Sequence, residues 1–251
     1  MTGLEIIELA GVGLVVGTLI GCVGIGGVLL VPSLAYLFGV PVHTAIPVAM
    51  VAYVLSGAVG ATLYARKGSI QWKPALWIIA GAAPAAFGGA LAVSVTPGKW
   101  LEVLIATLIV FAGINALRKT KSLSVATAPT MGAASLSGIG AVTGVGSAMT
   151  GTGGPLVLVP ITVWLGFPAI TAVGFSQAVQ MPIALSATVG NLMYGSIDWR
   201  LAAVLAPALI GGTVMGAKLA HAVPAETLRK ILACVLVLVG CFLLGRFVFA
   251  S

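Results

Sequence analysis

Two long stretches of this sequence carry no charge: residues 9–65 and 122–197 contain no Asp, Glu, Lys or Arg. Charged residues make up only 7% of the whole chain, whereas a water-soluble surface needs about a quarter. Several apolar runs reach the ~20 residues that a helix needs to cross ~30 Å of hydrocarbon. Membrane helices tolerate glycine and use it for close packing, which accounts for the 34 glycines. The sequence therefore predicts an all-α polytopic membrane protein.

Prolines and short polar loops divide the chain into apolar runs. The first run is too long for one span, and its pieces 5–20 and 28–38 would each cover about 16–24 Å at 1.5 Å per residue. This run predicts either a discontinuous helix that crosses the membrane or a hairpin that enters and returns. The expected runs are residues 5–38, 42–64, 74–95, 99–117, 130–166, 169–192, 200–221 and 225–249.

A glycine-rich break followed by a proline occurs twice, at Gly24-Ile25-Gly26-Gly27 and at Thr152-Gly153-Gly154-Pro155. A shift of 128 residues places Gly26 on Gly154 and Pro32 on Pro160. After a one-residue deletion, a shift of 127 pairs two further segments, which are Gly68-Ser69-Ile70-Gln71-Trp72 and Gly195-Ser196-Ile197-Asp198-Trp199. This order of matches indicates an internal duplication.

The duplication predicts two homologous halves of one membrane domain, residues 1–119 and 130–251, joined by a linker at 120–129. Each half would hold a glycine-broken helix or hairpin plus three spans. Equivalent loops of the halves exchange their positive bias, and cytoplasmic loops are enriched in Lys and Arg, so the exchange favours inverted repeats. Parallel halves with four full spans stay open as the alternative. The basic residues divide nine to three in the inverted arrangement and eight to four in the parallel one.

The paired breaks are the best candidates for a binding site, because breaks at corresponding positions of two repeats point to a transport site. Non-helical backbone survives inside a bilayer only where it is buried in protein or lines a cavity. Each break would leave free N–H groups at the start of the following half-helix, and these can bind an anion without a cationic side chain. Tight helix packing is the alternative role. The candidate residues are Gly24, Ile25, Gly26, Gly27, Thr152, Gly153 and Gly154.

Residues 169–192 also carry a polar stripe, since Gln177, Gln180 and Asn191 fall on one side at 100° per residue. Polar side chains at membrane depth normally face the bundle interior. They would either line a substrate path or hydrogen-bond between helices. The candidate side chains are Gln177, Gln180 and Asn191, with Tyr53 at the position in the first half that corresponds to Gln180, and Ser176 as a weaker candidate.

The sequence argues against several other functions. The apolar interiors hold no carboxylates, and Cys22, Cys234 and Cys241 have no metal-binding spacing, so we expect no metal and no cofactor. Most basic residues lie in short loops and indicate topology, which argues against a nucleic-acid partner. An intramembrane enzyme would need a nucleophile–base pair that His43 and His221 do not suggest. The N-terminus lacks the basic region of a signal peptide, so we expect mature chain there.

The duplicated glycine motif with its following proline, together with the Gly-Ser-Ile-x-Trp stretch, resembles the sulfite exporter TauE/SafE family over about residues 10–248. The resemblance implies a small secondary carrier of the bacterial inner membrane that moves sulfite, organosulfonates or similar sulfur anions. The first copy departs from the family by reading Gly-Ile-Gly-Gly-Val where many members have a third consecutive glycine. A carrier or channel for another small anion, such as a carboxylate, is the alternative. Coupling to a proton or Na⁺ and oligomer formation stay open.

Overall fold

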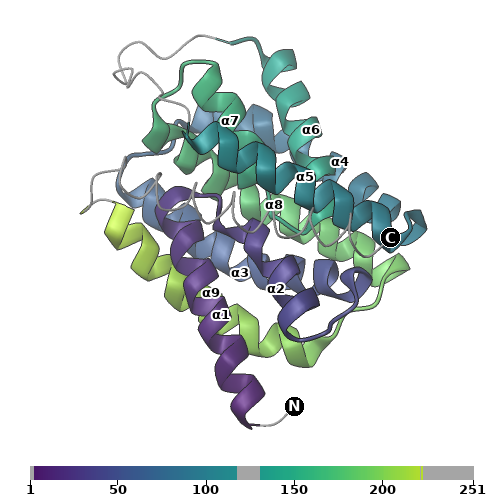
Figure 1. Ribbon diagram of the computed structural model, residues 1–251. Helices are drawn as coiled ribbons and strands as arrows, with labels where there is room; N and C mark the ends of the chain where they lie inside the picture. Colours follow the sequence, from purple (N-terminus) through teal and green to yellow (C-terminus); the bar gives the residue numbers. More distant parts are fainter. Residues whose placement is uncertain (1–2, 118–130, 221, 223–251) are drawn as a thin grey trace.

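The computed structural model describes residues 3–117, 131–220 and 222, and within these residues the chain is helical and has no strand. The helices lie within a few residues of the expected apolar runs, whereas the run 225–249 and the linker 120–129 lie outside the described residues. In chain order (Figure 1) the elements are α1 (Gly3–Val23), the 3-10 turn η1 (Gly26–Leu29), α2 (Leu30–Leu37), α3 (Val42–Arg66), α4 (Trp72–Val95), α5 (Gly98–Leu117), α6 (Ala133–Thr150), α7 (Pro155–Trp164), α8 (Ala169–Tyr194) and α9 (Trp199–Ala220).

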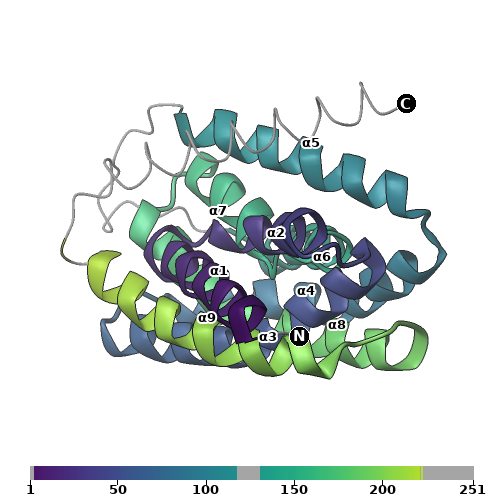
Figure 2. The ribbon, with the colours of Figure 1, turned by 60° about the horizontal axis from the view of Figure 1, so that its bottom comes forward.

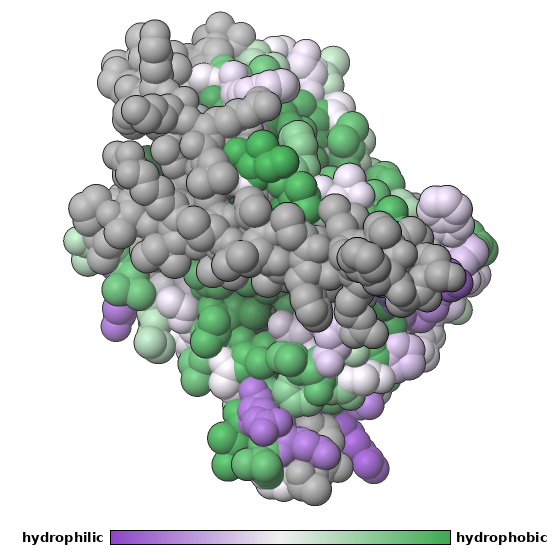
Figure 3. Space-filling model, in the orientation of Figure 1, coloured by the Kyte–Doolittle hydropathy of each residue, from purple (hydrophilic) through white to green (hydrophobic). Residues whose placement is uncertain are grey.

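Five of the described helices are long and apolar enough to cross a membrane, namely α1, α3, α4, α8 and α9. Large apolar side chains on these helices point outward, including Leu55, Leu76 and Leu185. Much of the described surface in Figure 3 is hydrophobic, and the strongly hydrophilic residues gather at its lower tip and right edge. Contiguous apolar surface of this kind is suited to contact with lipid, so the polytopic membrane fold expected from composition is confirmed.

Both glycine breaks reverse the direction of the chain. A methyl group added to Gly26 would lie 2.6 Å from the backbone nitrogen of Ile20, so η1 folds back onto the last turn of α1. In the second break, a methyl group on Gly146 of α6 would lie 3.6 Å from Cγ2 of Val157 on α7. A continuous helix would separate these two residues by about 16 Å at 1.5 Å per residue. The returning hairpin, one of the two expected geometries, is therefore the one observed in both places.

The long arms of the two hairpins make the same kind of contact with different helices. α1 packs closely along α9, and α6 packs closely along α4. Small residues bring the backbones together: a methyl group on Gly17 of α1 would lie 2.5 Å from the carbonyl oxygen of Leu209, and one on Gly144 of α6 would lie 2.9 Å from the carbonyl carbon of Ala82. Such close approach is a common way for membrane helices to associate.

These two helix pairs correspond to each other under the repeat, since a shift of 127 places α4 on α9 and α1 on α6. Each pair joins an arm from one expected half to a span from the other. Reciprocal contacts of this kind are what halves related by a twofold axis would make. The direction of such an axis relative to the bilayer, and hence the inverted arrangement, stays a prediction.

Helices α3 and α8 form the centre of the described bundle. They pack against each other, α3 packs also against α9, and α8 packs also against α4. Figure 2 shows α5 along the top and α9 at the bottom, with α2 and α7 between these levels. Tyr53 and Tyr64 of α3 and Phe175 of α8 are fully buried. The core between the hairpins therefore contains polar side chains from the two central helices.

Candidate functional site

The structure brings the two breaks into contact. A methyl group on Gly27 would lie 2.7 Å from the carbonyl oxygen of Thr152, and η1 also contacts α7. Each break begins with a glycine in the left-handed region, Gly24 at φ +80° and Gly151 at φ +66°. Residues with a side chain rarely adopt this conformation, which explains why glycine starts both reversals. Two unwound segments that lie far apart in the sequence thus form one surface inside the protein.

The two left-handed glycines refine the repeat. Gly24 donates its N–H to the carbonyl of Ile20, and Gly151 donates its N–H to the carbonyl of Ser147, so both terminate the preceding helix. They are 127 residues apart, whereas the sequence comparison matched Gly26 with Gly154 at 128. By backbone role the 127-residue shift therefore continues through the break. Gly151 is a break residue that the sequence analysis did not include.

The half-helices that follow the breaks start without side-chain caps among the described residues. η1 begins after Ile25, and α7 begins after Gly154 with Pro155 in its first turn, as the sequence predicted. The first N–H groups of a helix have no partner within it. Gly153 and Gly154 are also left-handed, at φ +73° and +117°. The second break therefore offers uncapped N–H groups and the positive end of a ten-residue helix.

Tyr53 and Gln180 lie on either side of this surface, and both are almost completely buried. The Tyr53 hydroxyl donates to the carbonyl of Gly27 at 2.7 Å. A methyl group on Gly153 would lie 3.0 Å from the Tyr53 ring and 3.4 Å from Cγ of Gln180. The Gln180 amide nitrogen has a long contact of 3.4 Å with Oγ of Ser56, and its Oε1 has no partner among the described residues. The amide of Gln180 is thus the least satisfied side chain beside the breaks.

Thr152 contributes to the second break mainly as an acceptor. The Thr150 hydroxyl donates to the carbonyl of Gly146 at 2.7 Å, and it lies 3.1 Å from the Thr152 hydroxyl. Since the Thr150 hydrogen is already used, Thr152 is the donor in the contact between the two hydroxyls. Its hydroxyl hydrogen is therefore not free for an anion.

The other predicted side chains are placed differently. Ser176 donates to Val173 of its own helix, and its Oγ would lie 2.8 Å from a methyl group on Gly24, so it borders the first break. The Gln177 amide nitrogen donates to the carbonyl of Ile20 at the end of α1. Asn191 lies eleven residues beyond Gln180, which is ~16 Å along a helix. The structure therefore brings Ser176 and Gln180 to the breaks but does not bring Asn191 there.

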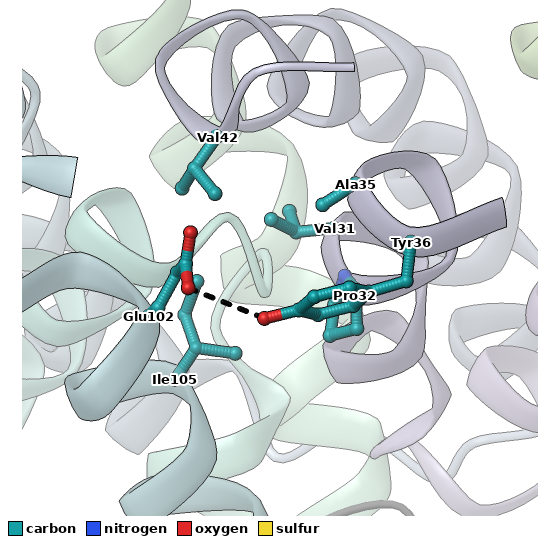
Figure 4. Close-up of a pocket in the computed structure, with 7 residues that line it drawn as sticks. All are labelled: Val31, Pro32, Ala35, Tyr36, Val42, Glu102 and Ile105. Atoms are coloured by element: carbon teal, nitrogen blue, oxygen red, sulfur yellow. Dashed lines mark hydrogen bonds between the residues drawn. The ribbon is translucent and has the colours of Figure 1, made fainter. Parts of the chain in front are cut away.

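A small pocket lies beside the site rather than in it (Figure 4). Its walls come from α2, the start of α3 and α5, and the Tyr36 hydroxyl donates to Oε2 of Glu102 at 3.3 Å across it. Val31 lines the pocket and would also contact a methyl group on Gly151. Val31 thus separates this pocket from the second break. The sequence analysis did not single out any of these residues.

The fold and the paired breaks define a polytopic membrane transporter built around two reentrant hairpins. The sulfite exporter TauE/SafE family matches residues 9–243, and the chain belongs to this family. The resemblance found in the glycine motifs is therefore confirmed, and so are a function in membrane transport and the exclusion of an enzyme.

Several relatives are similar over nearly their whole length. The "Probable membrane transporter protein YdhB" of Bacillus subtilis (strain 168) is 27% identical over 236 residues, which cover 91% of this chain and 96% of the relative. The "Probable membrane transporter protein MJ0441" of Methanocaldococcus jannaschii is 27% identical over 255 residues, with 93% of each chain covered. The "Probable membrane transporter protein YunE" of B. subtilis (strain 168) is 23% identical over 268 residues, covering 95% and 97%. No solved structure matches this chain at a significant level.

Proposed function

We propose that this chain is a secondary transporter of small sulfur-containing anions, such as sulfite or an organosulfonate, in a bacterial inner membrane. The observation that carries the proposal is the contact between the two unwound segments at Gly27 and Thr152, with the incompletely satisfied amide of Gln180 beside it. Unwound backbone within the membrane-spanning part of a transporter is a common site for substrate. The breaks are buried, so a bound anion would be shielded from water and lipid.

The positive potential for an anion would come from backbone rather than from Lys or Arg. No Lys or Arg lies in residues 122–197, which include the second break. The N-terminus of α7 supplies about half a positive charge together with uncapped N–H groups. This partial charge would bind an anion weakly enough to permit its release.

Gln180 would add a side-chain donor. At present its nitrogen has only the 3.4 Å contact with Ser56. If its terminal amide rotates by half a turn, Oε1 can accept from the Ser56 hydroxyl, and the two N–H groups turn to the other side. The amide would then be satisfied on one side by Ser56 and on the other by the anion, which resolves the unpartnered Oε1.

A binding panel on the purified protein tests this function. Sulfite, thiosulfate, sulfoacetate and acetate are titrated separately, with protein melting temperature and isothermal calorimetry as readouts. We expect the sulfur anions to bind and Gln180→Leu to weaken their binding, because the same site holds them. Equal binding of acetate would identify a general small-anion or carboxylate carrier, and binding of none of the four would contradict the proposal.

A further inference from the structure

A second polar cluster lies at the C-terminal end of α1, where α1, α3, α8 and α9 meet. It contains two buried oxygen atoms without partners among the described residues, Oε1 of Gln177 and Oγ1 of Thr213. Both side chains are fully buried, at 0% exposure. Buried polar atoms are nearly always hydrogen-bonded, so two unpartnered oxygens in one place call for a ligand.

The orientation of the Gln177 amide is set by its neighbour. Its Nε2 donates to the carbonyl of Ile20 at 3.0 Å, and a carbonyl can only accept, so Oε1 must face the opposite side. On that side a methyl group on Gly60 would overlap Oε1 and would lie 3.4 Å from Cγ2 of Thr213. Gln177 and Thr213 therefore flank the same glycine of α3, and the absence of a side chain at Gly60 leaves the space between them.

The surroundings of this space favour a cation over an anion. The end of α1 carries the negative end of its helix dipole and its last carbonyl groups. Two of these carbonyls already attract donors: that of Ile20 accepts from Gln177 and Gly24, and that of Gly21 accepts from the Tyr64 hydroxyl at 2.8 Å. A cluster of His, Cys, Asp or Glu that could hold a transition metal is absent from the described residues. Neutral carbonyl and hydroxyl oxygens at the end of a broken helix are instead typical ligands of Na⁺ in transporters.

We propose that Gln177 Oε1 and Thr213 Oγ1 are ligands of a Na⁺ ion bound beside the end of α1. Gln177 precedes Gln180 by less than one turn of α8, so this site lies next to the breaks. A bound cation would supply a full positive charge where the protein has no cationic side chain, and it would strengthen anion binding nearby. By reciprocity the anion would strengthen Na⁺ binding by the same factor, which is the basis of coupled transport.

The corresponding place in the repeat has no such oxygens. A shift of 127 places Met50 on Gln177 and Ala86 on Thr213, and both apolar residues are fully buried. The two hairpins would therefore share one cation site rather than hold two. A single cation per transport site follows from this asymmetry.

The test uses the purified full-length chain and Na⁺ itself as the probe. Its melting temperature is measured in NaCl and in choline chloride at equal ionic strength, without any anion substrate. Affinity for the best anion of the panel is then measured in both salts. We expect Na⁺ to raise the melting temperature and to tighten anion binding about tenfold, within the usual range of coupling between sites. Unchanged values in the two salts would overturn the cation site and would indicate a buried water at this place.

Substitutions locate the effect. Thr213→Val keeps the shape of the side chain and removes the oxygen, so we expect it to abolish both Na⁺ effects, whereas Thr213→Ser should retain them. Thr188→Val is the matched control, because Thr188 is also buried with an unpartnered hydroxyl but lies elsewhere on α8. Persistence of both Na⁺ effects in folded Thr213→Val would contradict the proposal. The melting shift needs no anion, so this proposal can fail while anion binding persists, or survive if the proposed substrate is wrong.

Discussion

The first break has one left-handed glycine, Gly24, whereas the second has three, at 151, 153 and 154. After the first break the chain continues as a 3-10 turn, and the carbonyl of Gly27 accepts the Tyr53 hydroxyl. After the second break α7 begins directly at Pro155, next to the incompletely satisfied amide of Gln180. The backbone reversal is thus common to both breaks, but its side-chain support differs.

The difference centres on one pair of equivalent positions. Tyr53 and Gln180 are 127 residues apart, and both lie against Gly153. The phenol uses its hydroxyl to hold the first break in place, so it has no hydrogen left for a substrate. The amide of Gln180 has donors in excess of its partners. We infer that the first break acts as a rigid wall of the site and that the second break presents the donors.

The largest expected effect separates the two breaks by folding. Gly26→Leu should give little folded protein, because its Cβ would lie 2.6 Å from the backbone nitrogen of Ile20, and overpacking against backbone costs about 3 kcal/mol or more. Gly154→Leu should fold and lose transport, since its Cβ meets only the flexible end of Ile183 at 3.2 Å and the strain of φ +117° costs about 1–3 kcal/mol. Size-exclusion profiles and uptake into proteoliposomes measure these outcomes.

Gly88→Leu is the control for this comparison, because Gly88 of α4 has open space around it and should tolerate the change. Normal transport by Gly154→Leu would show that the second break serves only helix packing. Well-folded Gly26→Leu would show that the hairpin does not close as tightly as the structure indicates.

The next effect concerns binding at the second break. Gln180→Leu should weaken anion binding tenfold or more, since a hydrogen bond to a charged group contributes about 1.5–3 kcal/mol. Stability should change little, because the substitution also removes an unpartnered buried oxygen. Calorimetric titration of the anion measures the loss. Met181→Leu, on the exposed side of the same helix, is the control, and affinity within twofold of the original in Gln180→Leu would remove Gln180 from the site.

At the first break the same experiment should affect stability instead. Tyr53→Phe leaves the buried Gly27 carbonyl without the hydroxyl, at a cost of about 1–3 kcal/mol. Anion affinity should fall less than in Gln180→Leu. Thermal unfolding and titration of the same preparation separate the two quantities, with exposed Tyr194→Phe as the control. A larger loss of affinity than of stability would assign Tyr53 to the substrate rather than to the wall.

Much of this arrangement could be predicted from sequence because it depends on local pattern. Uncharged apolar runs fix the helices, and glycine followed by apolar residues and proline marks each break. The repeat also pairs Tyr53 with Gln180 before any contact is known. These features depend on residue spacing along one segment.

What could not be predicted depends on contacts between distant segments. The polar stripe placed Gln177, Gln180 and Asn191 on one side of a helix, but a side says nothing about depth. Gln177 faces the end of α1 because it reaches Ile20, 157 positions away, and Asn191 lies further along the helix. Gly60 and Thr213 carry no local signal, since their importance comes from the space that Gly60 leaves beside Gln177.

The smallest expected effect comes from the basic loops. Lys73→Gln, at the exposed start of α4, should change anion affinity by less than twofold at physiological salt, because exposed charges are screened beyond about 8 Å. Gln177→Ala should weaken binding more than this, provided that Na⁺ is present, because it removes an oxygen from the proposed cation site. Titrations of both variants at low and physiological salt test the order. If binding collapsed in Lys73→Gln and ignored Gln177→Ala, the attraction for the anion would come from the surface, and neither the backbone of the breaks nor a bound cation would be its main source.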